Sequence, residues 1–321
     1  MYDPKSLKAD EFIDHQEILD TLRYAEEHKH DVALIDSILE KARPQKTATG
    51  YHCAGLTHRE ASVLLACDIP EKIEEMYRLA EEIKLAFYGN RIVIFAPLYL
   101  SNYCVNGCVY CPYHQKNKHI PRKKLTQEEV EKEVIALQDM GHKRLAIETG
   151  EDPVNCPIEY VLDCIHTIYS IKHKNGAIRR VNVNIAATTE DAYRQLKAAE
   201  IGTYILFQET YRRARYEELH PSGPKAATPG TLRPTTAPWP PASTTWGSAC
   251  CSVWKAMLRV RRLLMHAEHL EAVFGVGPHT ISVPRVKRRA TSTPTISITA
   301  FPTRCSRRSS RSSASPCPTR A

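Results

Sequence analysis

Three cysteines within eight positions are the residues of this chain most able to do chemistry. Cys104, Cys108 and Cys111 are separated by three and then two residues in SNYCVNGCVYCPYH. Thiolates spaced this closely bind zinc or iron–sulfur clusters. They follow the apolar run RIVIFAPLYL, which predicts a buried strand, so we expect them in the loop that leaves that strand. In α/β folds, the residues that carry out chemistry lie at this end of the strands.

The number of ligands separates the two kinds of metal centre. Tetrahedral zinc takes four protein ligands, and His114 is the nearest fourth ligand, but Cys-x3-Cys-x2-Cys-x2-His is a cramped arrangement. A [4Fe–4S] cubane has four irons that each need an outer ligand, so three cysteines leave one iron open. The pattern therefore favours a cluster whose open iron binds a small molecule, with zinc as the alternative.

The other cysteines and the start of the chain indicate a cytoplasmic protein. The first residues, MYDPKSLKADEFID, are charged and unlike a signal peptide, and no window approaches the roughly 18 apolar residues of a membrane span. Eleven cysteines in such a protein are not expected to form a disulfide framework. Cys53, Cys67, Cys156 and Cys164 stand singly and are predicted to be small buried side chains.

The cysteines must be positioned by strands and helices that alternate along the chain. Apolar strands are expected at RIVIFAPLYL, RLAIETG, RVNVNIA and TYILFQET, with helices over 125–141, 158–176 and 189–202 between them. Thr126 and Glu129 form a capping-box pattern at the first of these helices. Strict alternation implies a parallel sheet in an α/β fold, either a (β/α) barrel or a doubly wound sheet. The polar strand ends SNYC, ETGED, NIAATT and FQET then gather at one rim.

The net charge of +8 is the sum of two unlike parts. Residues 1–218 carry 29 Lys and Arg against 34 Asp and Glu, whereas residues 219–321 carry 15 against 2. Residues 226–256 contain five prolines, no acid and no regular apolar period, and the pattern fails again after residue 285. These stretches are either native disordered segments with a basic end or out-of-frame translations. We favour the second interpretation, since a patterned island separates them: residues 261–277 have an apolar helical spacing, and a strand is expected over 279–285.

The cysteine loop resembles a known signature. With Tyr110 just before the third cysteine, its spacing is similar to that of the radical S-adenosylmethionine (SAM) enzymes. The runs IETGEDP, VNVNIAATT, YILFQET and HPSGPK further resemble the tyrosine lyases of [FeFe]-hydrogenase maturation. This likeness covers residues 1–225 almost continuously and resumes over LLMHAEHLEAVFGVGPHTISVPR. The related 2-iminoacetate synthases of thiamine biosynthesis are the alternative, and a non-catalytic metal-binding protein is another.

The resemblance implies a fold, cofactors and an activity. The fold would be a TIM-type (β/α) barrel with N-terminal helices, and the cofactors a [4Fe–4S] cluster on the three cysteines and SAM on the open iron. The reaction would cleave the Cα–Cβ bond of L-tyrosine to p-cresol and dehydroglycine. Its partners would be an electron donor such as ferredoxin or flavodoxin and other hydrogenase maturation proteins, with no nucleic acid and no membrane.

The resemblance also implies roles for single residues at the SAM site. Tyr110, Gly150 and Glu151 would bind the cofactor, with Gly150 allowing close backbone approach and Glu151 accepting from the ammonium group of SAM. Arg194 would bind the methionine carboxylate, although a helix-surface arginine is an equal alternative.

Further residues would bind tyrosine or iron. Arg285 would hold the tyrosine carboxylate, while Gln208 and Ser282 would orient its amino group, or else make ordinary buried hydrogen bonds. His266 and His269 share one helix face, and the family places an iron-binding histidine in this segment. From the sequence alone, two surface histidines are favoured. No catalytic acid or base is assigned.

The expected domains follow from these patterns. Residues 1–88 form an N-terminal helical extension, 89–288 the barrel, disrupted at 226–256, and 289–321 a disordered basic tail. The chain departs from the family at Tyr211-Arg212-Arg213-Ala214 and shows no counterpart of the family's C-terminal Cys-x2-Cys segment. These departures predict a weakened or defective copy of the enzyme.

Overall fold

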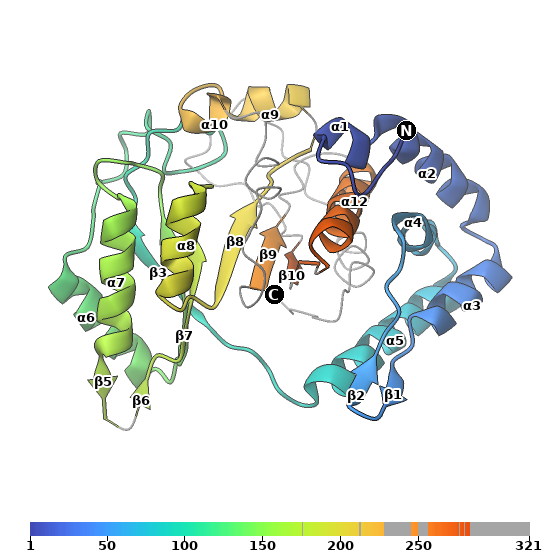
Figure 1. The fold of residues 1–321 in the computed structure, drawn as a ribbon, viewed down its shortest axis with the longest axis horizontal. Coiled ribbons are helices and arrows are strands. Elements are labelled where there is room, and N and C mark those ends of the chain that lie inside the picture. The colour runs from blue at the N-terminus through green and yellow to red at the C-terminus, as the bar shows by residue number, and fades with distance from the viewer. Residues whose placement is uncertain are drawn as a thin grey trace.

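The structure is a computed structural model that describes residues 1–174, 176–211, 213–227, 245–249, 256–275, 277–278 and 280–282 (Figure 1). A group of N-terminal helices lies on one side, a curved sheet with its covering helices on the other, and helix α12 between them. No helix in these ranges is long and apolar enough to cross a membrane.

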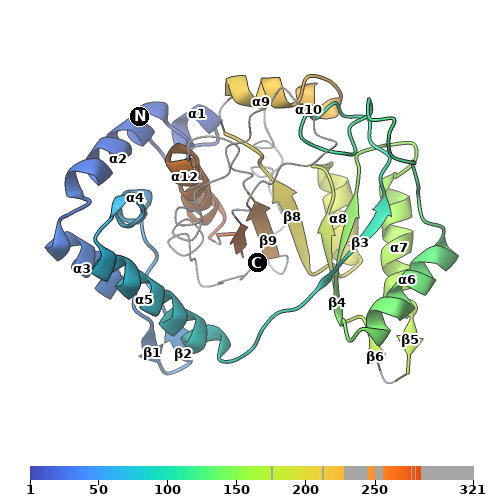
Figure 2. The same cartoon turned by 180° about the vertical axis from the view of Figure 1, so that it is seen from behind.

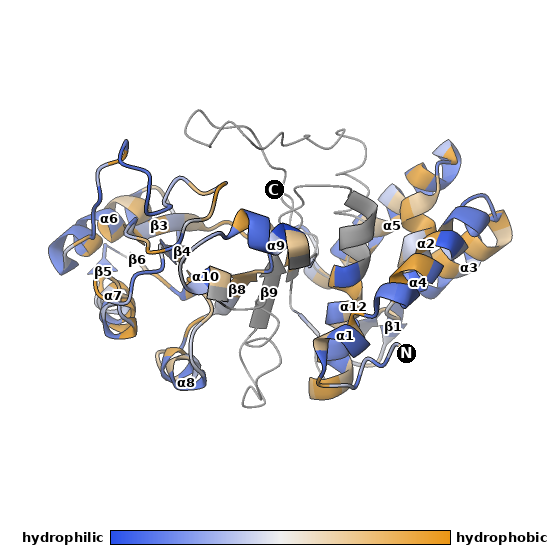
Figure 3. Cartoon of the chain, turned by 90° about the horizontal axis from the view of Figure 1, so that it is seen from above, coloured by the Kyte–Doolittle hydropathy of each residue, from blue (hydrophilic) through white to orange (hydrophobic). Residues whose placement is uncertain are grey.

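The N-terminal part is a set of helices whose ends are fixed by short polar side chains. It contains α1 (Ala9–Phe12), α2 (His15–His28), α3 (Val32–Lys41), α4 (His58–Ala66), α5 (Pro70–Tyr88) and the hairpin β1 (Gln45–Thr47) and β2 (Gly50–His52). Asp14 and Asp31 accept from backbone N–H groups at the starts of α2 and α3, and Thr57 and Glu60 form a capping box on α4. These helices mix hydrophobic and hydrophilic residues (Figure 3) and bury a core of their own.

Six strands form a parallel sheet in which spatial order follows chain order. They are β3 (Ala96–Ser101), β4 (Arg144–Thr149), β7 (Arg180–Asn184), β8 (Thr203–Phe207), β9 (Thr245–Ala249) and β10 (Thr280–Ser282). The order β3-β4-β7-β8-β9-β10 is that of a (β/α) barrel, since a doubly wound sheet reverses direction from its first strand. Among the described strands, β3 and β10 are edges, so the barrel is not closed.

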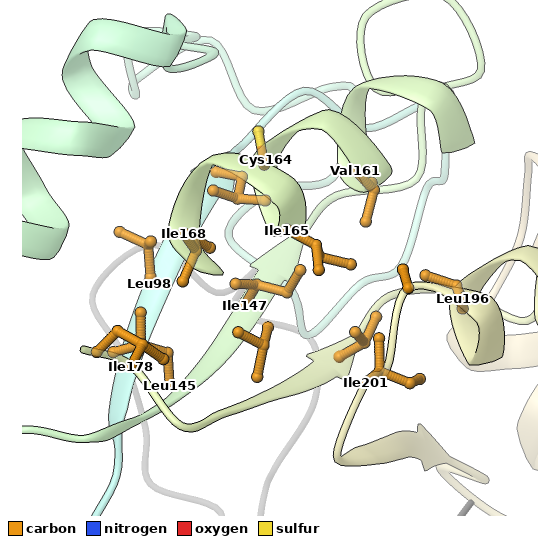
Figure 4. Close-up of a cluster of buried hydrophobic side chains, with 14 of the residues drawn as sticks. Leu98, Leu145, Ile147, Val161, Cys164, Ile165, Ile168, Ile178, Leu196 and Ile201 are labelled. Atoms are coloured by element: carbon orange, nitrogen blue, oxygen red, sulfur yellow. The ribbon is translucent and has the colours of Figure 1, made fainter. Parts of the chain in front are cut away.

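Helices cover the convex face of the sheet. They are α6 (Gln127–Asp139), α7 (Ile158–Ser170) and α8 (Glu190–Ala198), and α6 begins with the predicted capping box of Thr126 and Glu129. Ile147 from β4 meets Ile165 and Ile168 from α7 in the buried core (Figure 4). Among the residues that the structure describes after β8, the helices are α9 (Arg213–Leu219), α10 (Pro224–Ala227) and α12 (Ala256–Phe274). Burial of this apolar side leaves the concave side of the sheet for polar residues.

Two predicted elements are shorter in the structure. The strand expected over residues 91–100 begins only at Ala96, because β4 begins at Arg144 and offers residues 91–95 no partner. Residues 91–95 form an extended connection from α5 to β3 (Figure 2), and Ile92 is 80% exposed. The helix expected over 158–176 ends at Ser170, and the hairpin β5 (Lys172–His173) and β6 (Gly176–Ala177) follows.

Residues 226–256, which lack a regular apolar period and were expected to disrupt the barrel, contain a strand of the sheet. Strand β9, at Thr245–Ala249, pairs in parallel with β8 and β10 and lies inside the sheet. Backbone hydrogen bonds with two neighbours place this strand without any apolar period. The predicted helix and strand after residue 261 are confirmed as α12 and β10. Residues 283–321 lie outside the described residues, and the three domain limits and the out-of-frame hypothesis stay predictions.

Candidate functional site

The cysteine loop leaves β3 at the carboxyl edge of the sheet, as predicted. Cys108 is 5% exposed, Cys104 and Cys111 are half-buried, and all three are free thiols. The backbone turns tightly between them, because the Cys111 N–H donates to the Cys108 carbonyl at 3.2 Å and the His114 N–H to the Cys111 carbonyl at 3.2 Å. Cys108 and Cys111 therefore stand on one compact turn, and Cys104 lies on the chain that leads into it.

Arg122 fixes the base of this loop. Its guanidinium donates from Nη1 to the carbonyls of Asn102 (2.5 Å) and Tyr113 (2.9 Å), and from Nη2 to those of His114 (2.8 Å) and Asn117 (3.2 Å). One planar five-donor group thus satisfies carbonyls on both sides of the cysteines. Sequence reasoning missed this role because Arg122 stands in a charged run that resembles a solvated surface.

The end of β4 touches the cysteine loop through its backbone. The Gly150 N–H donates to the Ser101 carbonyl (3.0 Å), and the Val105 N–H donates to the Glu151 carbonyl (2.8 Å). A Cβ on Gly150 would lie 2.1 Å from the carbonyl oxygen of Tyr103, a backbone atom that cannot move aside cheaply. Close backbone approach therefore requires glycine at position 150.

The side chain of Glu151 supports the loop. The Asn106 side chain donates from Nδ2 to Glu151 Oε2 at 2.5 Å. The binding of SAM by Gly150 and Glu151 stays a prediction.

A segment that is remote in sequence docks on the same loop. The Gly107 N–H donates to the Ser222 carbonyl (2.9 Å), the Val109 N–H to the Leu219 carbonyl (3.1 Å), and the Lys225 N–H to Asn106 Oδ1 (2.9 Å). A Cβ on Gly107 would lie 2.2 Å from Ser222 Oγ. Residues 219–225, named the docking segment below, therefore hold the cysteine loop from outside.

A tyrosine and a histidine add a side-chain contact to this docking. His220 Nδ1 is 2.8 Å from the Tyr216 carbonyl and therefore carries the proton, since a carbonyl only accepts. Nε2 then accepts from the Tyr110 hydroxyl at 2.9 Å. Burial lowers the pKa of His220 and raises that of Tyr110 well above its ordinary value, so both are neutral. Tyr110, predicted to bind cofactor, thus uses its hydroxyl within the protein.

Burial also determines the chemistry of the thiols. It raises the pKa of Cys108 to about 12 and raises that of Cys111 above its ordinary value. Without a metal, these thiols are protonated at neutral pH. Because metals bind thiolates, metal binding at this loop must release protons.

The ligand geometry distinguishes a cluster from a single ion. Within the described residues, which include His114 and all three cysteines of the loop, no three His, Cys, Asp or Glu side chains are placed to share one metal ion. Binding of zinc by this loop stays a prediction. A cubane takes one cysteine on each of three irons, so its ligands need not converge on one point. Three free thiols on one short loop fit a cubane.

Comparison with known proteins gives the family of the chain. The radical SAM superfamily model matches residues 98–225. The X-ray structure of the FeFe-hydrogenase maturase HydG from Carboxydothermus hydrogenoformans is 31% identical, with a TM-score of 0.78, over 96% of this chain and 68% of that chain. The chain belongs to the HydG family of radical SAM proteins. This family carries a [4Fe–4S] cluster and SAM, in agreement with the predicted cofactors.

Two other relatives define how much of a full-length protein this chain spans. A second crystal structure of HydG is 45% identical with a TM-score of 0.80, over 94% of this chain and 64% of that chain. The 2-iminoacetate synthase of Salmonella typhimurium is 27% identical over 54% of this chain and 44% of its own length. The chain thus spans less than half of this curated relative and about two thirds of HydG.

The other predicted site residues have different positions. Arg194 lies on α8, more than half exposed, in an ion pair with Glu190. Gln208 is buried after β8, where its side-chain amide donates to the Thr210 carbonyl at 3.3 Å. Ser282 is the last residue of β10, and Arg285 lies outside the described residues. Their roles toward SAM and tyrosine stay predictions.

The prediction that His266 and His269 lie on the surface was wrong. Both are buried, because the N-terminal residues pack over α12: the Phe12 ring stacks on His269 at 3.7 Å, and His269 Nδ1 donates to the Pro4 carbonyl at 2.8 Å. His266 Nδ1 lies 2.8 Å from the Tyr211 hydroxyl, and burial lowers the pKa of His266 to about 3. Iron binding by these histidines stays a prediction.

Proposed function

We propose that this chain is a radical SAM lyase of [FeFe]-hydrogenase maturation that cleaves the Cα–Cβ bond of L-tyrosine to p-cresol and dehydroglycine. The observation that carries the proposal is the likeness to HydG over nearly the whole chain, together with a cysteine loop at the carboxyl end of the first barrel strand. When bound, the cluster and SAM supply a 5′-deoxyadenosyl radical. An electron donor such as ferredoxin or flavodoxin would reduce the cluster.

The concave face of the sheet supplies polar groups for a small substrate. Leu145 and Ile147 of β4 face the buried helices, so Glu148 points to the other face, and the same alternation places Asn182 and Asn184 of β7 beside it. Burial raises the pKa of Glu148, whose carboxyl group is hydrogen-bonded to Asn184. A buried carboxyl beside amides suits the ammonium or hydroxyl group of an amino acid.

One buried acceptor on this face has no partner. Asn182 Oδ1 makes no hydrogen bond to the described residues. An orphaned buried acceptor is costly unless water or a ligand satisfies it. The other face of the sheet is apolar and covered by helices. The unpaired acceptor therefore supports the concave face as the side that binds substrate.

The test is an anaerobic assay on reconstituted protein. The protein is incubated with a reductant, SAM and L-tyrosine, and 5′-deoxyadenosine and p-cresol are measured separately. We expect 5′-deoxyadenosine with only a low yield of p-cresol, because the departures from the family predict a weakened enzyme, and neither product from a variant in which Cys104, Cys108 and Cys111 are all alanine. 5′-Deoxyadenosine without p-cresol would contradict tyrosine as the substrate, and iron without either product would indicate a non-catalytic metal protein.

The likeness to 2-iminoacetate synthase keeps a second pathway in view. That enzyme would share the cleavage of tyrosine, so p-cresol alone does not separate the two. Growth of a strain that lacks its own 2-iminoacetate synthase, without added thiamine, would favour the thiamine pathway. Restored hydrogenase activity in a strain without its maturase would favour the pathway of hydrogenase maturation.

A further inference from the structure

A lysine and a glutamate form an ion pair next to the cysteine loop. Lys225 Nζ lies 3.1 Å from Glu209 Oε1, and only 22% of the Lys225 side chain and 10% of the Glu209 side chain are exposed. Glu209 follows β8, and Lys225 lies in α10 at the end of the docking segment, so the pair ties the end of β8 to the segment that holds the cysteine loop. Taking two charges out of water is costly, which makes a purely stabilising role a weak explanation.

The backbone at Glu209 is strained. Its φ is +59°, a conformation that residues other than glycine rarely adopt. The Thr210 N–H donates to the Gln208 carbonyl at 2.6 Å, which closes a three-residue turn around Glu209. Such strain persists only where the surroundings hold it. The backbone at Glu209 is therefore held in place, and its carboxylate contacts Lys225 and the Tyr110 hydroxyl.

The backbone at Lys225 is fixed as well. Gly223 has φ +90°, and a Cβ there would lie 2.7 Å from the Cα of Asn106 and 2.8 Å from the Val105 carbonyl oxygen. The docking segment thus crosses the cysteine loop at backbone distance just before Lys225. The Lys225 N–H itself donates to Asn106 Oδ1 at 2.9 Å, so Lys225 stands against the loop between Cys104 and Cys108 with its side chain largely buried.

We propose that Lys225, paired with Glu209 against the cysteine loop, is a positioning residue whose ammonium group favours the reduced state of a cluster bound to the loop. A thiolate-ligated cluster gains one negative charge when it takes up one electron from an external reductant. A fixed positive charge nearby stabilises that added charge, more strongly than in water because the site is largely buried. The inference concerns the cluster alone and holds whatever the substrate is.

The experiment measures the cluster's redox equilibrium with no SAM and no tyrosine present. Reconstituted protein is poised at fixed potentials with a mediator, and the ratio of reduced to oxidised cluster is read by electron paramagnetic resonance and visible absorbance. For Lys225→Met we expect this ratio to fall about tenfold, which corresponds to about 59 mV for one electron. Lys225→Arg keeps the charge and should restore the ratio.

A substitution at Glu209 should change the ratio of reduced to oxidised cluster in the opposite direction. Glu209→Gln removes a negative charge and leaves the ammonium group, so the ratio should rise. A role in folding alone would instead reduce the iron content of both variants. Lys123→Met is the matched control. Lys123 also pairs with a glutamate, at 2.7 Å from Glu129, but its side chain is 61% exposed. We expect no change in the ratio of reduced to oxidised cluster for this variant.

Each outcome of these redox measurements either supports or overturns the proposal on Lys225. Opposite shifts in the Lys225→Met and Glu209→Gln variants, with the control unchanged, support the proposal. An unchanged ratio in Lys225→Met overturns it. If Lys225→Met binds no iron, Glu209→Gln decides alone: a raised ratio supports the proposal, while an unchanged or lowered ratio, or loss of iron there too, overturns it. Loss of p-cresol with the expected redox shifts would contradict only the proposed function.

Discussion

Two polar regions of the molecule are held together by different means. The cysteine loop is held by backbone hydrogen bonds, by Arg122 and by close glycine contacts. The contact between the N-terminal helices and α12 is held by charged side chains, since buried His58 lies between Glu17 (2.9 Å) and Glu268 (2.7 Å). Backbone contacts fix geometry within a few tenths of an ångström and do not titrate. Carboxylate–histidine contacts depend on pH, so the two regions should respond differently to substitution and to pH.

The largest expected effect is at the cysteine loop, where backbone contact leaves no room. Gly150→Ala places a Cβ 2.1 Å from the Tyr103 carbonyl oxygen, so the loop must shift and the cluster should be lost. Iron content after anaerobic reconstitution measures this. Gly55→Ala is the matched control, because nothing lies within 4 Å of its added Cβ, and it should hold iron normally. Full iron content in Gly150→Ala would show that the loop is not fixed by this contact.

A smaller effect is expected where side chains make the contact. Glu268→Ala removes the acceptor of the His58 backbone N–H (2.6 Å), of His58 Nδ1 and of the Tyr2 hydroxyl (2.5 Å). Breaking such a buried pair should lower the free energy of unfolding by about 3 kcal/mol. Urea unfolding measures the change, and Glu271→Ala, at an exposed position on the same helix, should change it by less than about 0.5 kcal/mol. Equal effects would mean that the pair does not hold α12 to the N-terminal helices.

Removal of one hydroxyl should have a smaller effect again. Tyr110→Phe leaves His220 Nε2 without its donor and should cost about 1 kcal/mol of stability. Because the backbone contacts of the docking segment remain, we expect the cluster to bind with unchanged iron content. Thermal unfolding and iron analysis of the same sample test both parts, and loss of iron would place this hydrogen bond among the contacts that fix the loop.

The smallest expected effect is a pH dependence of stability at the contact between the N-terminal helices and α12. The contacts with Glu268 and Glu17 raise the pKa of His58 against the opposing effect of burial, so its contribution to stability is complete below its unfolded pKa of about 6.5 and is lost as pH rises through the folded value. Hydrogen bonds from Arg59 and His58 lower the pKa of Glu17 to about 2, so its contribution is complete above its unfolded value of about 4.3 and is lost as pH falls.

These two dependences together predict a maximum between about pH 4.5 and 6.5. The measurement is the melting temperature of the wild-type chain minus that of His58→Gln, as a function of pH. A flat difference would contradict the titration of this cluster. The corresponding difference for Gly55→Ala, whose added Cβ meets nothing within 4 Å, should be flat over the same range.

Much of the fold follows from local patterns, while the exceptions follow from pairing. The capping box at Thr126 and the apolar period of residues 262–274 are local signals, and both elements occur where they were expected. Strand β9 has no such local signal. It forms because two neighbouring strands supply its backbone hydrogen bonds. Residues 91–95 have the composition of a strand but lack a partner strand, and remain exposed.

The sequence by itself determined the cysteine spacing, the family and its cofactors, and the αβ alternation, because these are properties of residues close together in the chain. Only the tertiary structure decided that Arg122 and residues 219–225 hold the cysteine loop, that His266 and His269 are buried, and that Lys225 pairs with Glu209 next to the loop. Each of these depends on segments that approach one another only when the strands are assembled. The physical reason is that burial, strain and charge at a site are set by neighbours in space, and a linear pattern does not contain them.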